Sequence, residues 1–121
     1  MSEFLRDPIS PSQFALPKTN QLENIATSLD YLSIKKVALI FRALNHKLRQ
    51  DMLRMIDKKG KVSVTEIFVD LRLEQSVASQ HLAILRRAGI LLTEREGKFM
   101  YYKLNSERLH MINHMVVDLL K

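Results

Sequence analysis

The sequence predicts a mainly α-helical fold that carries one β-hairpin. Residues 63–104 follow the order helix, tight turn, second helix and two extended runs joined through a glycine. A capping pattern at Ser63, a stop at Gly89 and a hairpin signal at Gly97 delimit these parts. The same order of elements is found in winged helix-turn-helix domains, whose second helix enters the major groove of DNA.

The chain ahead of this segment is expected to hold an extended arm and three helices. Pro8, Pro11 and Pro17 oppose a long helix in residues 1–18, and this arm either is loose or lies across a partner subunit. The domain itself is predicted over residues 19–121. Asn20 is expected to cap a first helix, and two more helices are predicted over residues 34–44 and 47–57.

The helix-turn-helix is predicted over residues 63–88. Ser63 and Glu66 have the spacing of a capping box, in which each side chain accepts from the backbone N–H of the other residue. Residues 72–74 are expected to form the turn, and the second helix to run from Gln75 to Ala88.

The second helix has two different faces. At about 100° per residue, Ala78, Leu82 and Leu85 form an apolar stripe that we expect to be buried. The opposite side is small and polar, which suits close approach to base edges: Gln pairs with adenine, Ser can donate or accept, and Val meets the thymine methyl group. The predicted DNA-binding residues of this helix are Gln75, Ser76, Val77, Ser79, Gln80 and Arg87.

The wing is predicted over residues 90–104, with its tip at residues 95–98. Arg95 and Lys98 place positive charge at the tip, where it can reach the minor groove or the phosphate backbone, and two nearby glutamates dilute that charge. Duplex binders expose no unstacked bases, so the aromatic residues of the wing are expected to pack it onto the helices. They are Phe99, Tyr101 and Tyr102.

Residues 106–121 are predicted to form a dimerisation helix. Their apolar side chains share one broad side, and a helix outside the winged part is expected to have little of its own domain to cover. A two-fold homodimer would hold two recognition helices about 34 Å apart and bind a pseudo-palindromic site. The predicted interface residues are Leu22, Ile25, Leu29, Leu109, Ile112, Met115, Val116 and Leu119.

Histidine placement supports only a weak metal hypothesis. His110 and His114 are four residues apart on the last predicted helix, and Asp118 lies one turn further along. Packed or solvated helix residues are the favoured interpretation, so no metal or other cofactor is predicted. His81 is expected to be a hydrogen-bonded packing residue rather than a base contact.

Positive charge is concentrated on the predicted DNA-binding part. The chain has 19 Lys and Arg against 13 Asp and Glu, and residues 34–105 hold fifteen of the former against seven of the latter. Such a charge distribution attracts polyanions. The dense cluster at residues 58–61 is interpreted as a solvated loop in preference to a DNA contact.

Four stretches occur in a familiar order: FRALNHKLRQDML at 41–53, SVTEI at 63–67, QSVASQHLAILRRAG at 75–89 and EGKFMYYKL at 96–104. Together they resemble the arsenic-repressor (ArsR/SmtB) family of bacterial winged helix-turn-helix regulators. The resemblance implies a homodimeric repressor that binds operators near promoters, and many members release DNA when a metal or another signal is sensed. It also implies base-reading positions on the second helix and wing contacts at Arg95 and Lys98. The base-reading positions are Ser76, Val77, Ser79 and Gln80.

The sequence departs from the family pattern at several positions. Lys47 stands where the family usually has Pro, and Glu74 where it usually has Ser or Thr. Metal-sensing relatives carry a Cys pair on the first helix of the motif, or Asp and His at the positions of Ser106 and Arg108, and neither pattern is present here.

Composition excludes several function classes. The chain has no cysteine, which excludes disulfides, thiolate catalysis and thiol-based sensing. No apolar run approaches the roughly 18 residues of a membrane span and no secretory pattern occurs, so a cytoplasmic protein without membrane contact is expected. The sequence contains neither a glycine-rich phosphate loop nor the signature of a catalytic nucleophile, so the protein is not expected to be an enzyme. A nonspecific architectural DNA-binding protein and a winged protein-interaction module remain as alternatives.

Overall fold

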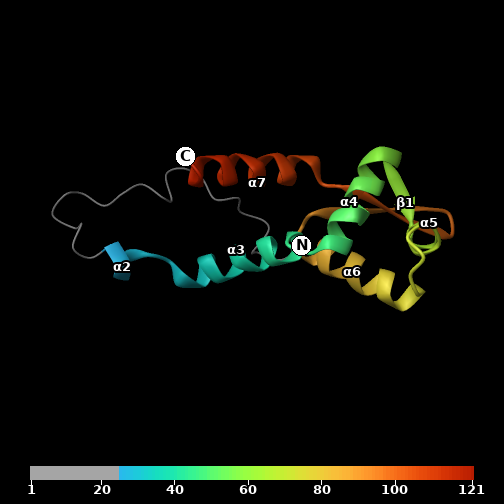
Figure 1. Cartoon of the computed structure of the whole chain (residues 1–121), viewed down its shortest axis with the longest axis horizontal. Helices are drawn as coiled ribbons and strands as arrows, with labels where there is room; N and C mark the ends of the chain where they lie inside the picture. The colour runs from blue at the N-terminus through green and yellow to red at the C-terminus, as the bar shows by residue number, and fades with distance from the viewer. Residues whose placement is uncertain (1–24) are drawn as a thin grey trace.

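The computed structural model of the chain describes residues 25–121. In chain order its elements are α2 (Ile25–Ser28), α3 (Tyr31–Leu44), α4 (Lys47–Lys59), β1 (Lys61–Ser63), α5 (Val64–Asp70), α6 (Gln75–Arg87), β2 (Leu91–Glu96), β3 (Phe99–Leu104) and α7 (Ser106–Leu119). Helices α3 and α7 extend to one side of a winged part that contains α5, α6 and the sheet (Figure 1). The predicted mainly helical fold with a β-hairpin wing is confirmed. The arm at residues 1–18, Asn20 and Leu22 lie outside the described residues.

Two helix boundaries at the amino-terminal end differ from the prediction. Helix α3 begins at Tyr31, three residues before the expected start, because the Asp30 carboxylate accepts a hydrogen bond from the Ser33 backbone N–H at 3.1 Å. Helix α4 continues to Lys59 and ends where Gly60 adopts a φ of +89°.

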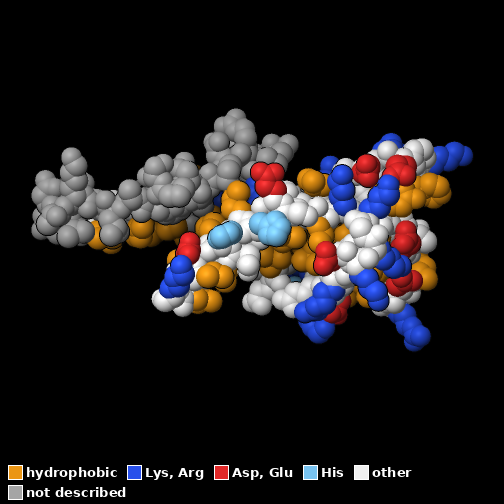
Figure 2. Space-filling model, turned by 90° about the horizontal axis from the view of Figure 1, so that it is seen from above, with side chains coloured by type: hydrophobic (Ala, Val, Ile, Leu, Met, Phe, Trp, Pro, Cys, Tyr) orange, Lys and Arg blue, Asp and Glu red, His pale blue; other side chains and the backbone are white. Residues whose placement is uncertain are grey.

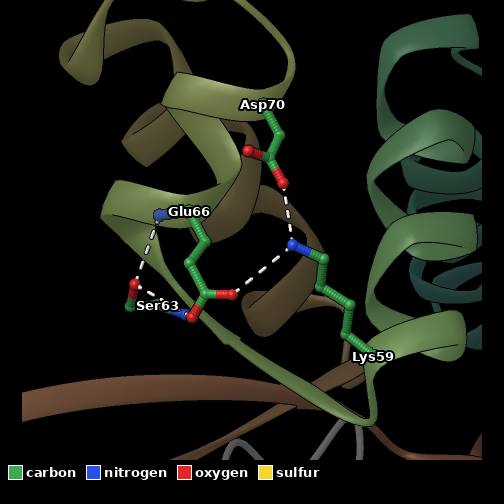
Figure 3. A network of polar contacts seen from close by, with 4 residues as sticks. All are labelled: Lys59, Ser63, Glu66 and Asp70. Atoms are coloured by element: carbon green, nitrogen blue, oxygen red, sulfur yellow. Dashed lines mark hydrogen bonds and ion pairs between the residues drawn. The ribbon is translucent and has the colours of Figure 1, made fainter.

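The predicted capping box at the start of α5 is confirmed (Figure 3). The Ser63 hydroxyl accepts from the Glu66 N–H at 3.2 Å, and the Glu66 carboxylate accepts from the Ser63 N–H at 3.3 Å. The Lys59 ammonium lies 3.6 Å from Glu66 and 2.8 Å from Asp70. Residues 58–61 are therefore not the expected loop: they end α4 and begin β1, and Lys59 ties α4 to α5.

The sheet has three antiparallel strands in the order β1-β3-β2. Strands β2 and β3 are joined by a two-residue turn in which Gly97 has a φ of +62°, as the first central position of a type II′ turn requires. Strand β1 pairs with the edge of β3 that faces away from β2, and Val62 lies opposite Tyr102. It was not predicted, because three residues are too few to show an alternating pattern.

The core lies between the sheet and the helices that surround it. Ala78, Leu82 and Leu85 of α6 are fully buried, as predicted, among other apolar residues. The remaining core residues are Ile40, Ala43, Met52, Ile56, Val62, Ile67, Ala88, Ile90, Leu91 and Ile112. Tyr102 packs against this core as expected, whereas the same expectation for Phe99 is wrong: Phe99 adjoins the hairpin turn and is 62% exposed.

Candidate nucleic-acid interface

Helix α6 turns a polar face outward from the winged part. Its buried stripe packs on the core, and contacts with α3, α4, α5 and β2 hold it on several sides. Of its predicted DNA-binding residues, Val77 is half-buried and the others are exposed. The exposed residues are Gln75, Ser76, Ser79, Gln80 and Arg87. The two faces of α6 thus divide as the sequence predicts, with small and amide side chains on the free side.

The amino end of α6 is open. Glu74 is its N-cap residue, yet the Glu74 side chain makes no capping hydrogen bond. The Glu74 carboxylate therefore does not accept a hydrogen bond from the backbone N–H groups of the first turn. These N–H groups and the positive end of the helix dipole both point out of the amino end of α6.

A buried arginine fixes α6 to the preceding helices. Arg49 is 8% exposed, and its guanidinium donates to the Ala43 carbonyl at 2.7 Å and to the Arg42 carbonyl at 3.2 Å. It also lies 3.2 Å from His81 Nδ1 of α6. His81 is thus a hydrogen-bonded packing residue, as predicted. The burial of Arg49 is not predicted from the sequence, because Arg49 is one of many basic residues and no local pattern distinguishes it from the exposed ones.

His46 completes this cluster. The rings of His46 and His81 are 4.9 Å apart, and His46 Nδ1 is buried without a hydrogen-bond partner within the described part of the chain. Burial lowers the pKa of His81, and the neighbouring His46 and Arg49 lower it further. His81 is therefore held neutral, with Nδ1 free to accept from Arg49.

The wing carries exposed positive charge at its tip. Arg95 and Lys98 are both exposed, and Lys98 occupies the hairpin turn. Lys61 of β1 lies 3.6 Å from Glu94 and forms an ion pair with Glu96. Glu94 and Glu96, the two acidic residues near the wing tip, are therefore paired with Lys61. Arg95 and Lys98 remain as exposed positive charges of the tip.

Basic side chains gather at the winged end of the molecule. Most of the Lys and Arg side chains visible in Figure 2 lie over that end, on the right. The exposed face of α6 and the wing tip belong to the same end (Figure 1). The polar face of α6 and many basic side chains thus share one end of the molecule, which fits the composition of a DNA-binding region.

The predicted dimer residues fall into three groups. Leu29 and Leu119 are exposed, the latter by 75%; Ile25, Leu109, Met115 and Val116 are half-buried. Ile112 is buried in the core of its own protomer. The expectation that α7 has little of its own domain to cover is therefore wrong, because one side of α7 packs on the core.

The metal hypothesis gains no support from the geometry. His110, His114 and Asp118 are exposed on α7, and Asp118 pairs with Lys121 at 3.3 Å. Within residues 25–121, no three His, Cys, Asp or Glu side chains are grouped closely enough to hold a metal ion. In the same residues, no helix combines the length and apolar character needed to cross a membrane.

Comparison with known proteins gives consistent similarities. Residues 46–92, which include α4, the helix-turn-helix and the start of β2, match the family described as bacterial regulatory protein, arsR family. The arsenic resistance transcriptional regulator ArsR1 of Pseudomonas putida is 36% identical over 64% of this chain, and the match spans 61% of ArsR1. The transcriptional repressor PagR of Bacillus anthracis is 30% identical over 69% of this chain and 84% of PagR.

Solved structures of related proteins share the fold. The crystal structure of PagR superposes with a TM-score of 0.57, covering 76% of this chain and all of that one at 28% identity. A homodimeric winged helix-turn-helix DNA-binding domain from Mycobacterium bovis, described as possibly of the ArsR family, superposes with a TM-score of 0.61 at 26% identity. That match covers 77% of this chain and 90% of the other.

Proposed function

Since this chain belongs to the arsR family of bacterial regulatory proteins, we propose that it is a homodimeric transcriptional repressor that binds a specific, pseudo-palindromic DNA site. The observation that carries the proposal is the exposed polar face of α6. Ser76, Ser79 and Gln80 stand free of the fold while the other side of the same helix is fully buried. Such side chains read base edges in the major groove, and Arg95 and Lys98 hold the wing on the backbone.

Uncovered apolar surface supports the homodimer. Helix α3 exposes Tyr31, Leu32 and Leu39, and the end of α7 exposes Leu119 and Leu120. Large apolar side chains left exposed on these two helices favour an interaction site there. Both helices extend away from the winged part (Figure 1), so a partner bound there leaves α6 free for DNA. The proposed interface combines Leu29 and Leu119 with the half-buried Ile25, Leu109, Met115 and Val116.

The face of α6 also favours sequence-specific over architectural binding. A protein that binds DNA by charge alone needs cations on the contact face, but the first two turns of α6 expose Gln75, Ser76, Ser79 and Gln80 there. A pure protein-interaction module is disfavoured by the basic side chains at the same end of the molecule (Figure 2). Binding to genomic DNA would place the protein's action in the cytoplasm.

A thiol-bound metal does not fit this chain as a signal that releases it from DNA. Soft metals and metalloids are bound by thiolates, and the chain contains no cysteine. The arsenic resistance in the name of ArsR1 is therefore said of that relative alone, and any effector of this chain must be recognised by groups other than thiolates.

Selection from a pool of random DNA duplexes tests the proposal, because the pool contains candidate operators of every sequence. We expect the protein to enrich an inverted repeat whose half-sites are centred about 10 base pairs apart. Fluorescence anisotropy should then show about 1000-fold tighter binding of that duplex than of a scrambled duplex of equal length at physiological salt. Absence of enrichment, with equal binding of both duplexes that collapses as salt rises, would favour the architectural alternative.

A further inference from the structure

The two helices of the helix-turn-helix end in the same backbone motif. At the end of α5, the Leu73 N–H donates to the Phe68 carbonyl at 2.8 Å and the Arg72 N–H donates to the Val69 carbonyl at 3.2 Å. At the end of α6, Ile90 and Gly89 make the equivalent bonds at 3.0 and 2.9 Å. Both pairs of bonds define a Schellman motif, whose residue after the cap takes a left-handed conformation.

The residue in that position differs between the two helices. After α6 it is Gly89, with a φ of +76°, and after α5 it is Arg72, with a φ of +55°. Within residues 25–121, Arg72 is the one residue other than glycine with a positive φ. Glycine adopts this conformation without steric penalty, whereas any residue with a Cβ is strained by it. The chain thus places a strained arginine where glycine would relieve the backbone.

The Arg72 side chain does nothing inside the described fold that offsets this strain. It is exposed and has no hydrogen-bond or ion-pair partner among residues 25–121. In contrast, Lys59, Lys61 and Arg49 each have a partner in the fold. Arg72 is therefore a cation that the turn presents to solvent.

The turn presents it beside the amino end of α6. Arg72 precedes Glu74 by two residues, so their Cα atoms are at most about 7.6 Å apart. Glu74 is exposed at the head of the helix, and its carboxylate is not used as a cap. A carboxylate in this place repels DNA phosphates when α6 enters the major groove. A guanidinium close by can bind a phosphate with two parallel hydrogen bonds.

We propose that Arg72 is a phosphate-binding residue that positions the amino end of α6 on the DNA backbone and offsets the repulsion from Glu74. The proposal rests on the proposed DNA-binding function. A backbone strained in the free protein thereby serves a contact made only in the complex, as strained residues at binding sites commonly do.

The test combines thermal unfolding with DNA binding of the full chain. Arg72→Asn removes the charge and tolerates the left-handed conformation, Arg72→Lys keeps the charge, and Lys58→Gln removes one exposed charge at the end of α4 as a matched control. The end of α4 and helix α6 lie at opposite edges of the winged part in Figure 1. Each protein is titrated with the selected duplex and with its scrambled form at several salt concentrations.

We expect Arg72→Asn to keep or raise the Tm while it weakens binding of both duplexes by about 100-fold to 10⁴-fold, because a dimer loses two charge-assisted contacts. The slope of log K against log salt should become less steep by about 2 for a dimer, because each lost phosphate contact removes about 0.9. Arg72→Lys should retain most of the slope, and Lys58→Gln should match the wild type.

Unchanged affinity and salt slope in Arg72→Asn, with wild-type discrimination between the duplexes intact, would overturn the role of Arg72 alone. Failure of the wild type to discriminate would instead count against the proposed function. The two failures are thus distinguishable, since the first is a comparison of variants and the second a comparison of duplexes.

Discussion

Replacement of Gln80 by alanine should separate base reading from folding. Gln80 is exposed on α6, and its side chain has no hydrogen-bond partner among residues 25–121. Alanine is a slightly better helix former than glutamine, so the exposed substitution should change the free energy of unfolding by less than about 0.5 kcal/mol. Any large effect of Gln80→Ala must then come from the complex with DNA.

The expected size of that effect follows from the dimer. One bidentate pair between a glutamine and an adenine contributes about 1–3 kcal/mol of discrimination. A two-fold dimer presents Gln80 twice, so the loss should total about 2–6 kcal/mol. At about 1.4 kcal/mol per tenfold, binding of the selected duplex should weaken by about 30-fold to 10⁴-fold. Binding of a scrambled duplex should stay the same, because no phosphate contact is removed.

Anisotropy titrations of both duplexes against wild type and Gln80→Ala measure this difference. Asn45→Ala, which removes an exposed amide between α3 and α4, is the control and should bind both duplexes as the wild type does. Equal affinities of wild type and Gln80→Ala for the selected duplex would refute base reading at this position. An equal loss on both duplexes would show that Gln80 contributes to general backbone contact instead.

Three further predictions concern how α5 and α6 are held. Ser63→Ala removes the acceptor for the Glu66 N–H and should lower the free energy of unfolding by about 1 kcal/mol in urea titrations; an unchanged midpoint would count against the capping box. Leu82→Ala, at a fully buried site, should cost about 2–5 kcal/mol, and Ile84→Ala on the exposed side of α6 clearly less; similar costs would contradict the assigned faces. The pKa of His81 is lowered by burial, so below its ordinary value of 6.5 the unfolded chain takes up a proton that the folded chain does not. Stability should therefore fall as pH decreases from about 6.5 until the folded pKa is reached, and His81→Gln should flatten this dependence in unfolding curves at stepped pH.

The candidate site was predictable where a short stretch of sequence determines it. The capping box needs only Ser63 and Glu66 at the right spacing, and the division of α6 needs only its helical period. The hairpin follows from a glycine between two extended runs, and its turn indeed lies at Gly97. Each of these features depends on residues within a few positions of one another, so local rules suffice.

Features that depend on distant residues were not predictable. Strand β1 exists because Val62 pairs with Tyr102, forty positions later. Arg49 is buried because the carbonyl groups of Arg42 and Ala43 and the ring of His81 meet at one point. Helix α7 packs one side on its own core through Ile112, which its periodicity alone cannot distinguish from a side turned to a partner. In all three cases the structure depends on contacts between residues far apart in the sequence, and a local periodicity carries no information about such contacts.

The ion pairs change what the basic composition means for DNA binding. Lys47, Lys59 and Lys61 are each held by carboxylates of the same chain, and Arg49 is buried. These four cations add to the net charge that attracts DNA over distance, but they are less available for direct contact with phosphates. The salt dependence of binding should therefore be weaker than the fifteen Lys and Arg of residues 34–105 suggest. If the proposed base contacts hold, discrimination between sequences then depends on the uncharged side chains of the first two turns of α6, which salt affects little.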